Sequence, residues 1–200
     1  MLIKELILKS DDRVLVLGST GFIGSRLIPE LSQRNIKLRL FVRNPSKVSA
    51  LIRENADIEV VSGDLVKGDG LRNALHGIHS AYYLVHSLGG KGIFKNTEFA
   101  EMDKRAAKNF IAAADAEGLK RVLYLGGLGE MGTNLSEHLK SRAEVAEILS
   151  SGKPSPTVLR AAVIIGAGGV EKIMQIDLTS DEKKLLAKSV DSVKSVVSLL

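Results

Sequence analysis

The sequence contains no cysteine in its 200 residues. Disulfide bridges, a thiol nucleophile and thiolate ligands for a metal are therefore excluded. No segment approaches the roughly 18 uncharged apolar residues that a membrane-spanning helix needs. Near the N-terminus, Lys4, Glu5 and Lys9 interrupt any apolar core of a signal peptide. From these absences we expect a cytoplasmic protein that has no membrane partner.

Long runs of basic residues are also lacking. The chain carries 28 Lys and Arg against 23 Asp and Glu, a net charge of +5, but the cations are spread along its length. This distribution gives little reason to expect nucleic acid as a partner, and we expect none. The hydrophobic content of 44% is enough for one globular unit with a core.

What the sequence does contain is an alternation of apolar segments and helical patterns up to about residue 165. The strand candidates are RVLVLG, KLRLFV, IEVVSG, AYYLVHS, RVLYLGG and TVLRAAVIIG. Helices are predicted between them near residues 22–34, 47–53, 69–75, 97–117 and 136–150. Strands separated by helices at this spacing predict right-handed crossovers and a parallel sheet covered on both faces. We therefore expect an α/β protein with a doubly wound parallel sheet, a Rossmann fold.

A glycine-rich segment, GSTGFIG, lies between the first strand and the first helix. In such a loop one glycine permits the tight turn, one lets backbone amides approach a pyrophosphate, and one allows the helix to pack closely on the strand. The alternative is a turn with a structural role alone. We predict a dinucleotide-binding loop made of Gly18, Ser19, Thr20, Gly21, Phe22, Ile23 and Gly24.

The choice between the two nicotinamide dinucleotides depends on the end of the second strand. A carboxylate there binds the ribose hydroxyl of NAD, but the stretch LFVRNPSK contains Arg43 and Lys47 and no acid. Cations at this point suit the 2′-phosphate of NADP, and arginine also suits the edge or face of adenine. We therefore favour NADP as the cofactor over NAD. The alternative is a solvated arginine at a helix entrance.

A second glycine cluster, at residues 166–169, is predicted to be a turn and not another phosphate loop. Glu171 stands where a third glycine belongs, and residues 170–178 alternate in polarity as in a strand. Thr179 and Glu182 then form a capping box that opens an amphipathic helix. We therefore divide the chain into a Rossmann domain at 1–166 and a C-terminal hairpin strand and amphipathic helix at 167–200. The apolar face of that helix would be buried against the sheet edge or in a homo-oligomer.

Six segments in order carry a family resemblance: GSTGFIG, LFVRNPSK, SGDL, AYYLVHSLGG, RVLYLGGLG and TVLRAAVIIG. With them, residues 13–166 resemble the atypical short-chain dehydrogenase/reductase proteins with an NAD(P)H-binding, NmrA-like Rossmann domain. The resemblance implies that Asp64 and Leu65 border the adenine and that the backbone around Val85 and His86 lines the cofactor. It also implies that the ends of the fourth and fifth strands face the nicotinamide.

The catalytic residues of that family are not matched. Its active members use a serine or threonine after the fifth strand and a Tyr-x-x-x-Lys pair on the next helix, whereas this chain has Gly126 and Gly127 and then SEHLKSRAEV. His138 and Arg142 have the same spacing, so the histidine would serve as acid or base and the arginine would hold an anionic or carbonyl group. The alternative is that His138 is a first-turn residue without a chemical role.

His86 is a second catalytic candidate, because strand ends in open sheets face the ligand crevice. A packed histidine, or one beside the cofactor without proton chemistry, is the alternative. His76 and His79 flank a predicted turn at Gly77, and two histidines without further ligands make a poor metal site. We expect no bound metal.

The tail, residues 166–200, is similar to the C-terminal strand and final helix of the lactate/malate dehydrogenases. No malate dehydrogenase activity is implied, because that family's catalytic histidine, aspartate and substrate arginines lie upstream in regions absent here. Two resemblances meeting at one strand suggest a chimeric chain. The alternative is a short natural member whose tail converged on this pattern.

Together these features predict an NAD(P)H-binding reductase-like protein, which if active would be an NADP-dependent oxidoreductase acting on the carbonyl of an unidentified small molecule. One alternative is a non-catalytic sensor of NADP(H) or an assembly module. Another is a chimeric chain without a selected function.

Overall fold

The computed structural model describes residue 9 and residues 11–86, 96–127 and 136–161. The strands are β1 (Arg13–Leu17), β2 (Lys37–Val42), β3 (Ile58–Ser62), β4 (Ile78–Tyr83), β5 (Arg121–Gly127) and β6 (Ser155–Ala161). The helices are α1 (Phe22–Gln33), α2 (Ala50–Arg53), α3 (Leu71–Leu75), α4 (Asn96–Glu117) and α5 (Glu137–Ser150), and Pro45–Lys47 forms a 3-10 turn, η2.

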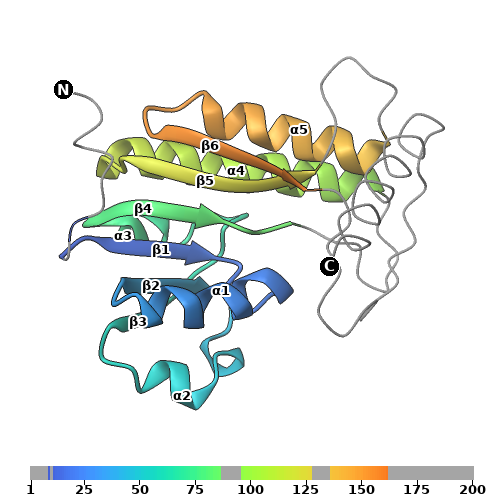
Figure 1. Cartoon of the computed structure of the whole chain (residues 1–200). Helices are drawn as coiled ribbons and strands as arrows, with labels where there is room; N and C mark the ends of the chain where they lie inside the picture. Colours follow the sequence, from blue (N-terminus) through green and yellow to red (C-terminus); the bar gives the residue numbers. More distant parts are fainter. Residues whose placement is uncertain (1–8, 10, 87–95, 128–135, 162–200) are drawn as a thin grey trace, which may run out of the picture.

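The strands form one six-stranded sheet in the order β3-β2-β1-β4-β5-β6 (Figure 1). All five neighbouring pairs are parallel. The chain starts at β1 in the middle, winds outward through β2 and β3, and then returns to β4 on the other side. The predicted doubly wound Rossmann fold is confirmed. Its switch point, where ligands bind in such sheets, lies between β1 and β4. The strand and helix predicted at 167–200 lie outside the described residues.

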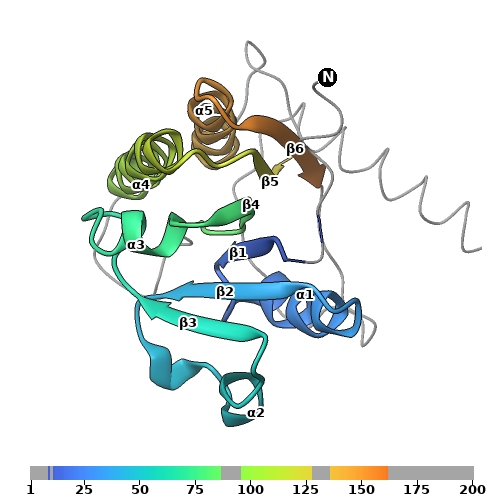
Figure 2. The same cartoon turned by 90° about the vertical axis from the view of Figure 1, so that its left-hand side faces the viewer.

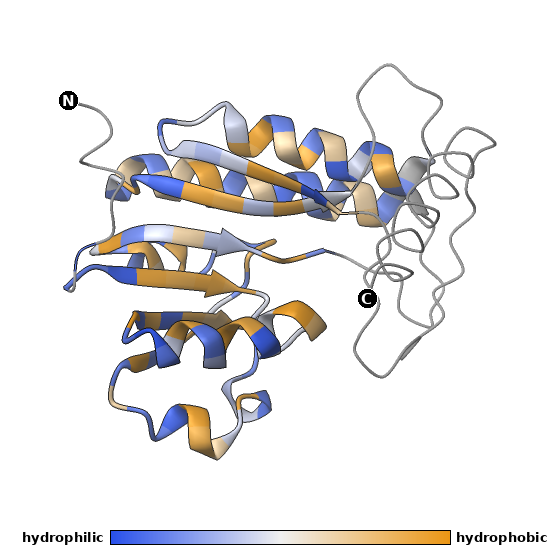
Figure 3. Cartoon of the chain, in the orientation of Figure 1, coloured by the Kyte–Doolittle hydropathy of each residue, from blue (hydrophilic) through white to orange (hydrophobic). Residues whose placement is uncertain are grey.

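Alternate residues along the central strands enter two separate hydrophobic cores. Leu15 and Leu17 join the core on one face, while Val14 and Val16 join the core on the other. This follows from the two-residue period of a strand, and Figure 3 shows the apolar residues of β1 in the centre of the sheet. Figure 2 shows α1 on one side of the sheet and α3, α4 and α5 on the other. Among the described residues, no helix is long and apolar enough to cross a membrane.

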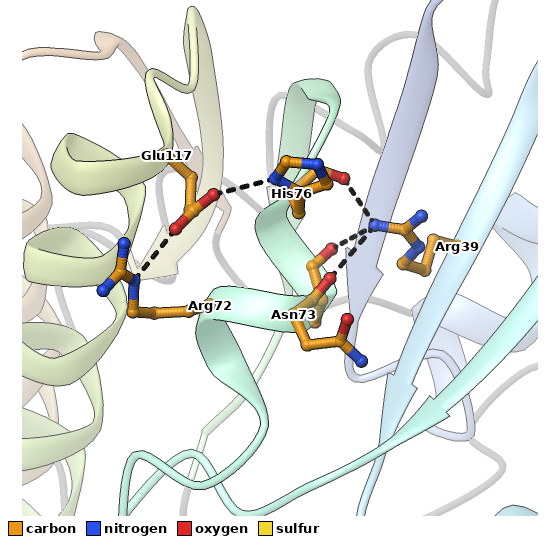
Figure 4. A network of polar contacts seen from close by, with 6 residues as sticks. Arg39, Arg72, Asn73, His76 and Glu117 are labelled. Carbon is orange, nitrogen blue, oxygen red and sulfur yellow. Dashed lines mark hydrogen bonds and ion pairs between the residues drawn. The ribbon is translucent and has the colours of Figure 1, made fainter.

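Polar contacts tie the elements together at the amino ends of the strands (Figure 4). Arg39 of β2 donates from Nη1 to the backbone carbonyls of Asn73, Ala74 and His76 at 3.3, 3.0 and 2.7 Å. These bonds satisfy carbonyls at the end of α3, which have no partner inside the helix. Glu117, near the end of α4, accepts from Arg72 at 2.9 Å and lies 3.2 Å from Nδ1 of His76. This edge is therefore used for structure, and the opposite edge carries the candidate site.

Three element boundaries differ from the sequence prediction. The helix predicted at 47–53 is η2 followed by α2, because Ser49 is extended and caps α2 by accepting from the backbone N–H of Ile52. The third helix starts at Leu71 and not near residue 69, since Gly70 before it has a φ of +74°.

The fourth strand starts at Ile78 and ends at Tyr83, earlier than the predicted AYYLVHS. His79 is therefore a strand residue, not part of a turn, and its Nδ1 lies 2.8 Å from Ser80 Oγ. His86 correspondingly lies beyond the end of β4 instead of within it. No group of three or more potential metal ligands occurs among the described residues.

Candidate functional site

The glycine loop follows β1 at the switch point of the sheet. Gly18 has a φ of +85°, which favours glycine, and a Cβ there would lie 2.8 Å from the carbonyl oxygen of Leu84. A Cβ on Gly24 would lie 2.2 Å from the carbonyl oxygen of Gly18 and 2.7 Å from the Cα of Ser19. Both glycines are therefore required by backbone that passes too closely for any side chain. Gly21, at the N-cap of α1, closes the turn with an N–H bond of 3.0 Å to Gly18 O.

The start of α1 has the features of an anion-binding site. No side chain caps it, and its first turn contains no acidic residue. The first backbone N–H groups of a helix have no intrahelical partner and attract negative charge. Ser19, 3% exposed, adds a buried Oγ that has no hydrogen-bond partner among the described residues. Uncapped amides, an unsatisfied hydroxyl and glycines at the closest approaches fit a bound pyrophosphate.

Arg43 and Lys47 lie beside this loop, on the segment that leaves β2. Arg43 follows the last strand residue, and Lys47 ends η2, whose start is capped by the Asn44 side chain. Both side chains are exposed, and neither is engaged by another side chain in the described part of the chain. Two available cations therefore stand at the position that selects between the dinucleotides.

The residues that the resemblance places around the cofactor behave differently from one another. Asp64 accepts hydrogen bonds from the backbone N–H groups of Val66 and Lys67 at 2.8 and 3.1 Å, so its carboxylate already shapes a turn. Leu65 is 6% exposed and belongs to the core, which leaves only its backbone to face a ligand. Val85 is partly buried against the same core.

His86, His138 and Arg142 are brought together near the carboxyl ends of β4 and β5. Arg142 donates from Nε to His138 Nε2 at 2.9 Å, and its Nη1 lies 3.2 Å from His86 Nε2. Ser136 caps α5 by accepting from the backbone N–H of Leu139, so His138 lies in the first turn of that helix. The three catalytic candidates thus form one polar cluster. Whether they have a chemical role stays a prediction.

The protonation of this cluster follows from its hydrogen bonds. Nε2 of His86 lies 2.8 Å from the carbonyl oxygen of Leu125, and because a carbonyl only accepts, this nitrogen carries the proton. Burial, and secondly the charge of Arg142, lower the pKa of His86 to about 4, so the ring is neutral at pH 7. His138 accepts from Arg142 at Nε2, which places its proton on Nδ1 when the ring is neutral.

The two glycines at the end of β5 lie against neighbouring side chains, and Gly127 leaves room for Arg142. A Cβ on Gly127 would lie 2.5 Å from Leu139 Cδ2 and 2.9 Å from Arg142 Cδ. A Cβ on Gly126 would lie 2.9 Å from the ring of Tyr124. The α5 side chains thus occupy the space in which the active family members would carry their hydroxyl residue.

Two contributors to the site were missed by the sequence analysis. Tyr124 on β5 donates to the backbone carbonyl of Arg142 at 3.3 Å and lies edge-on to the His86 ring at 5.6 Å. At the glycine loop, the guanidinium of Arg26 lies 3.6 Å from the centre of the Phe22 ring. The spacing of four residues between Phe22 and Arg26 is a signal for this second contact. The contact of Tyr124 depends on the packing of α5 and has no local signal.

Comparisons with known proteins identify a family and a shared fold. A family model described as NAD(P)H-binding matches residues 18–164. The chain is 30% identical over 189 residues to Protein TIC 62, chloroplastic, of Pisum sativum, a match that covers 82% of this chain and 34% of that protein. A short-chain dehydrogenase/reductase of Veillonella parvula solved in complex with NADP shares the fold with a TM-score of 0.61 at 15% identity, over 74% of this chain and 68% of the other.

A separate, short match concerns malate dehydrogenase. The chain is 54% identical over 37 residues to the enzyme of Heliobacterium modesticaldum, which is 18% of this chain and 12% of that protein. The length of this match is close to that of the tail, and the chimera stays a prediction. The chain spans about a third of the length of the first curated relatives that it matches. Since the family model covers most of the chain and the glycine loop lies at the switch point of the sheet, the chain belongs to the NAD(P)H-binding family and has a Rossmann fold.

Proposed function

We propose that this protein binds NADP(H) and reduces the carbonyl group of a small molecule. The observation that carries the proposal is the cluster of His86, His138 and Arg142, which lies at the same edge of the sheet as the glycine loop. In open α/β sheets, ligands bind outside the carboxyl ends of the strands near the switch point. A cofactor on the loop and a substrate at the cluster would therefore meet at this edge.

The cofactor would be held by backbone and by cations. The amides at the start of α1 and the Ser19 hydroxyl would bind the pyrophosphate, while Arg43 and Lys47 would pair with a 2′-phosphate. The absence of an acid at the end of β2 supports NADP over NAD. A solved neighbour of this fold contains NADP, which is consistent with this choice.

The chain's own residues would supply the proton and position the substrate. When bound, the reduced nicotinamide supplies a hydride to the carbonyl carbon. The carbonyl oxygen would then take a proton from Nδ1 of a charged His138, whose Nε2 faces Arg142. Arg142 would orient the substrate, and neutral His86 would hold the Leu125 carbonyl and the end of β5 in place.

A second candidate function is a non-catalytic sensor or assembly module that binds the same cofactor. The glycine pair at the end of β5 favours it, because α5 packs where the hydroxyl of active family members would be. In that case His138 and Arg142 would be structural partners of each other. A homo-oligomer formed through the C-terminal helix would suit this role and belongs to the same proposal.

The cofactor claim is tested by calorimetric titration with NADPH, NADP and NAD. We expect both phosphorylated forms to bind more tightly than NAD, and Arg43→Asp to weaken NADP binding by about ten- to a hundredfold, because a charge-assisted pair is lost and a repulsion added. Arg105→Asp, on an exposed face of α4, serves as the matched control and should bind normally. If none of the three cofactors binds, both candidate functions fail.

The same proteins then separate the enzyme from the sensor. Consumption of NADPH by the wild type across a panel of carbonyl compounds, with loss of that activity in His138→Ala, is the result expected of the reductase. Tight NADPH binding without turnover of any compound would leave the sensor as the better candidate.

A further inference from the structure

Arg142 is a partly buried cation without a carboxylate partner among the described residues. Its described side-chain contacts are with two histidine rings, His138 at 2.9 Å and His86 at 3.2 Å. Burial lowers the pKa of Arg142, although an arginine still stays charged. The charge of Asp103 on α4 raises the pKa of Arg142, but less than burial lowers it. Buried charges are normally paired, and no carboxylate of the described residues is recorded in an ion pair with this guanidinium.

Neither histidine can supply the missing negative charge. His86 is neutral and uses the Nε2 proton for the Leu125 carbonyl. His138 accepts a hydrogen bond at Nε2 from one N–H of Arg142. Since a guanidinium carries five N–H donors in a planar fork, donors of Arg142 remain for a further acceptor.

A cavity of about 280 Å³ opens beside this guanidinium, between α5 and strands β5 and β6. Its floor at Gly126 and Gly127 has no side chains, and Arg160 of β6 adds a second cation to the lining. Glu147 is the carboxylate among the lining residues, and it is exposed. The volume is close to the lower end of small-ligand pockets. A guanidinium with spare N–H donors beside a small cavity suits a ligand that carries a negative charge.

We propose that Arg142 forms a subsite for the carboxylate of a small oxo acid, and that the neighbouring carbonyl of this substrate is directed at His138. The inference rests on the proposed function and names its substrate class. The planar fork of an arginine matches the two oxygens of a carboxylate. Glu147 at the rim disfavours a dianion, so a carboxylate fits better than a phosphate ester.

The test is a calorimetric titration of benzoylformate and of its methyl ester into the full chain, alone and loaded with NADP, which cannot supply a hydride. The two probes differ in the charge of one group. We expect benzoylformate to bind and the ester to bind at least about tenfold more weakly, the loss of one charge-assisted contact. Arg142→Gln should lose about ten- to a hundredfold in benzoylformate affinity, Arg142→Lys less, and the exposed control Arg105→Gln nothing.

Three results would overturn the carboxylate subsite. They are equal binding of benzoylformate and its methyl ester, unchanged binding of benzoylformate by Arg142→Gln, and tighter binding of phenyl phosphate than of benzoylformate. Thermal unfolding of Arg142→Gln should show an unchanged or raised midpoint, because a partly buried charge is removed. A large drop would show that the guanidinium has a counter-ion within the protein and would also count against the subsite. NADP binding without benzoylformate binding defeats this inference alone, whereas benzoylformate binding without NADP binding defeats the proposed reductase.

Discussion

His86 shows how one buried polar side chain joins the parts of the site. It lies beyond β4, donates to a carbonyl of β5 and contacts the guanidinium of Arg142 on α5. The Tyr124 ring packs edge-on against it at 5.6 Å. Because burial and a neighbouring cation both oppose a charge on this ring, its neutral form is part of the folded structure.

The stability of the protein should therefore depend on pH through His86. The folded-state pKa of about 4 lies below the ordinary value of 6.5, so the unfolded chain binds the proton more readily. The contribution is fully present above pH 6.5 and is lost as the pH falls from there to about 4. We expect His86→Gln, whose amide can donate to the same carbonyl without titrating, to remove a pH-dependent term of about 3 kcal/mol or less.

Urea unfolding of both proteins at pH 7, 5.5 and 4 measures this term. Subtracting the free energy of unfolding of the variant from that of the wild type cancels the titration of groups that both proteins share. This difference should decrease as the pH falls. Two curves that stay parallel across the range would show that His86 is not held neutral by the fold.

At the scale of elements, the closest fit in the site is that of α1 against the loop after β1. Gly24 lies in the first turn of α1. A Cβ at this position would meet only backbone atoms, among them Gly18 O at 2.2 Å and Ser19 Cα at 2.7 Å. Backbone cannot move aside as a flexible side chain can. The helix is therefore positioned by the absence of a side chain.

Gly24→Ala should push α1 away from the loop. We expect it to lower the free energy of unfolding by about 1–3 kcal/mol, the usual cost of overpacking, and to abolish NADPH binding. Gly21→Ala is the matched comparison, because its Cβ would lie 3.2 Å from Gly18 O and needs only a small adjustment. Chemical unfolding and NADPH titration check both variants, and equal stability losses in the two would contradict this account of the packing.

The sequence predicted the elements better than their ends. Six apolar segments and the long helix α4 were identified because periodicity is strong in both. The start of β4 was missed because His79 and Ser80 interrupt its apolar pattern, yet pairing with β1 includes both Ile78 and Ser80. Tertiary pairing of the strands decides such ends, since a parallel strand lasts as long as its neighbour offers partners.

At the scale of the whole molecule, the described part of the chain contains two hydrophobic cores, formed by residues between Val14 and Val158. The six described strands end at Ala161. The family model, which matches residues 18–164, covers the same part.

A chain that ends at Gly169 should consequently keep the fold and the cofactor site. We expect its thermal midpoint to lie within about 4 °C of the full chain, which corresponds to roughly 1 kcal/mol in a protein of this size, and its NADPH affinity to be unchanged. A chain that ends at Ser150 is the control, because it lacks β6, which pairs with β5 along seven residues. Scanning calorimetry and NADPH titration compare the three, and precipitation of the longer truncated chain would show that the tail covers part of the domain.

The sequence by itself determined the fold class, the phosphate loop and the cations at the end of β2. These depend on local features, namely periodicity, glycine spacing and residue type at a fixed distance from a motif. Only the tertiary structure decided that His86, His138 and Arg142 share one cluster, in which His86 and Arg142 are 56 positions apart in the sequence. It also decided that the recorded side-chain contacts of Arg142 within the described residues are with two histidine rings. The physical reason is that charge and proton placement depend on which groups the fold brings within a few ångströms, and no local pattern contains that information.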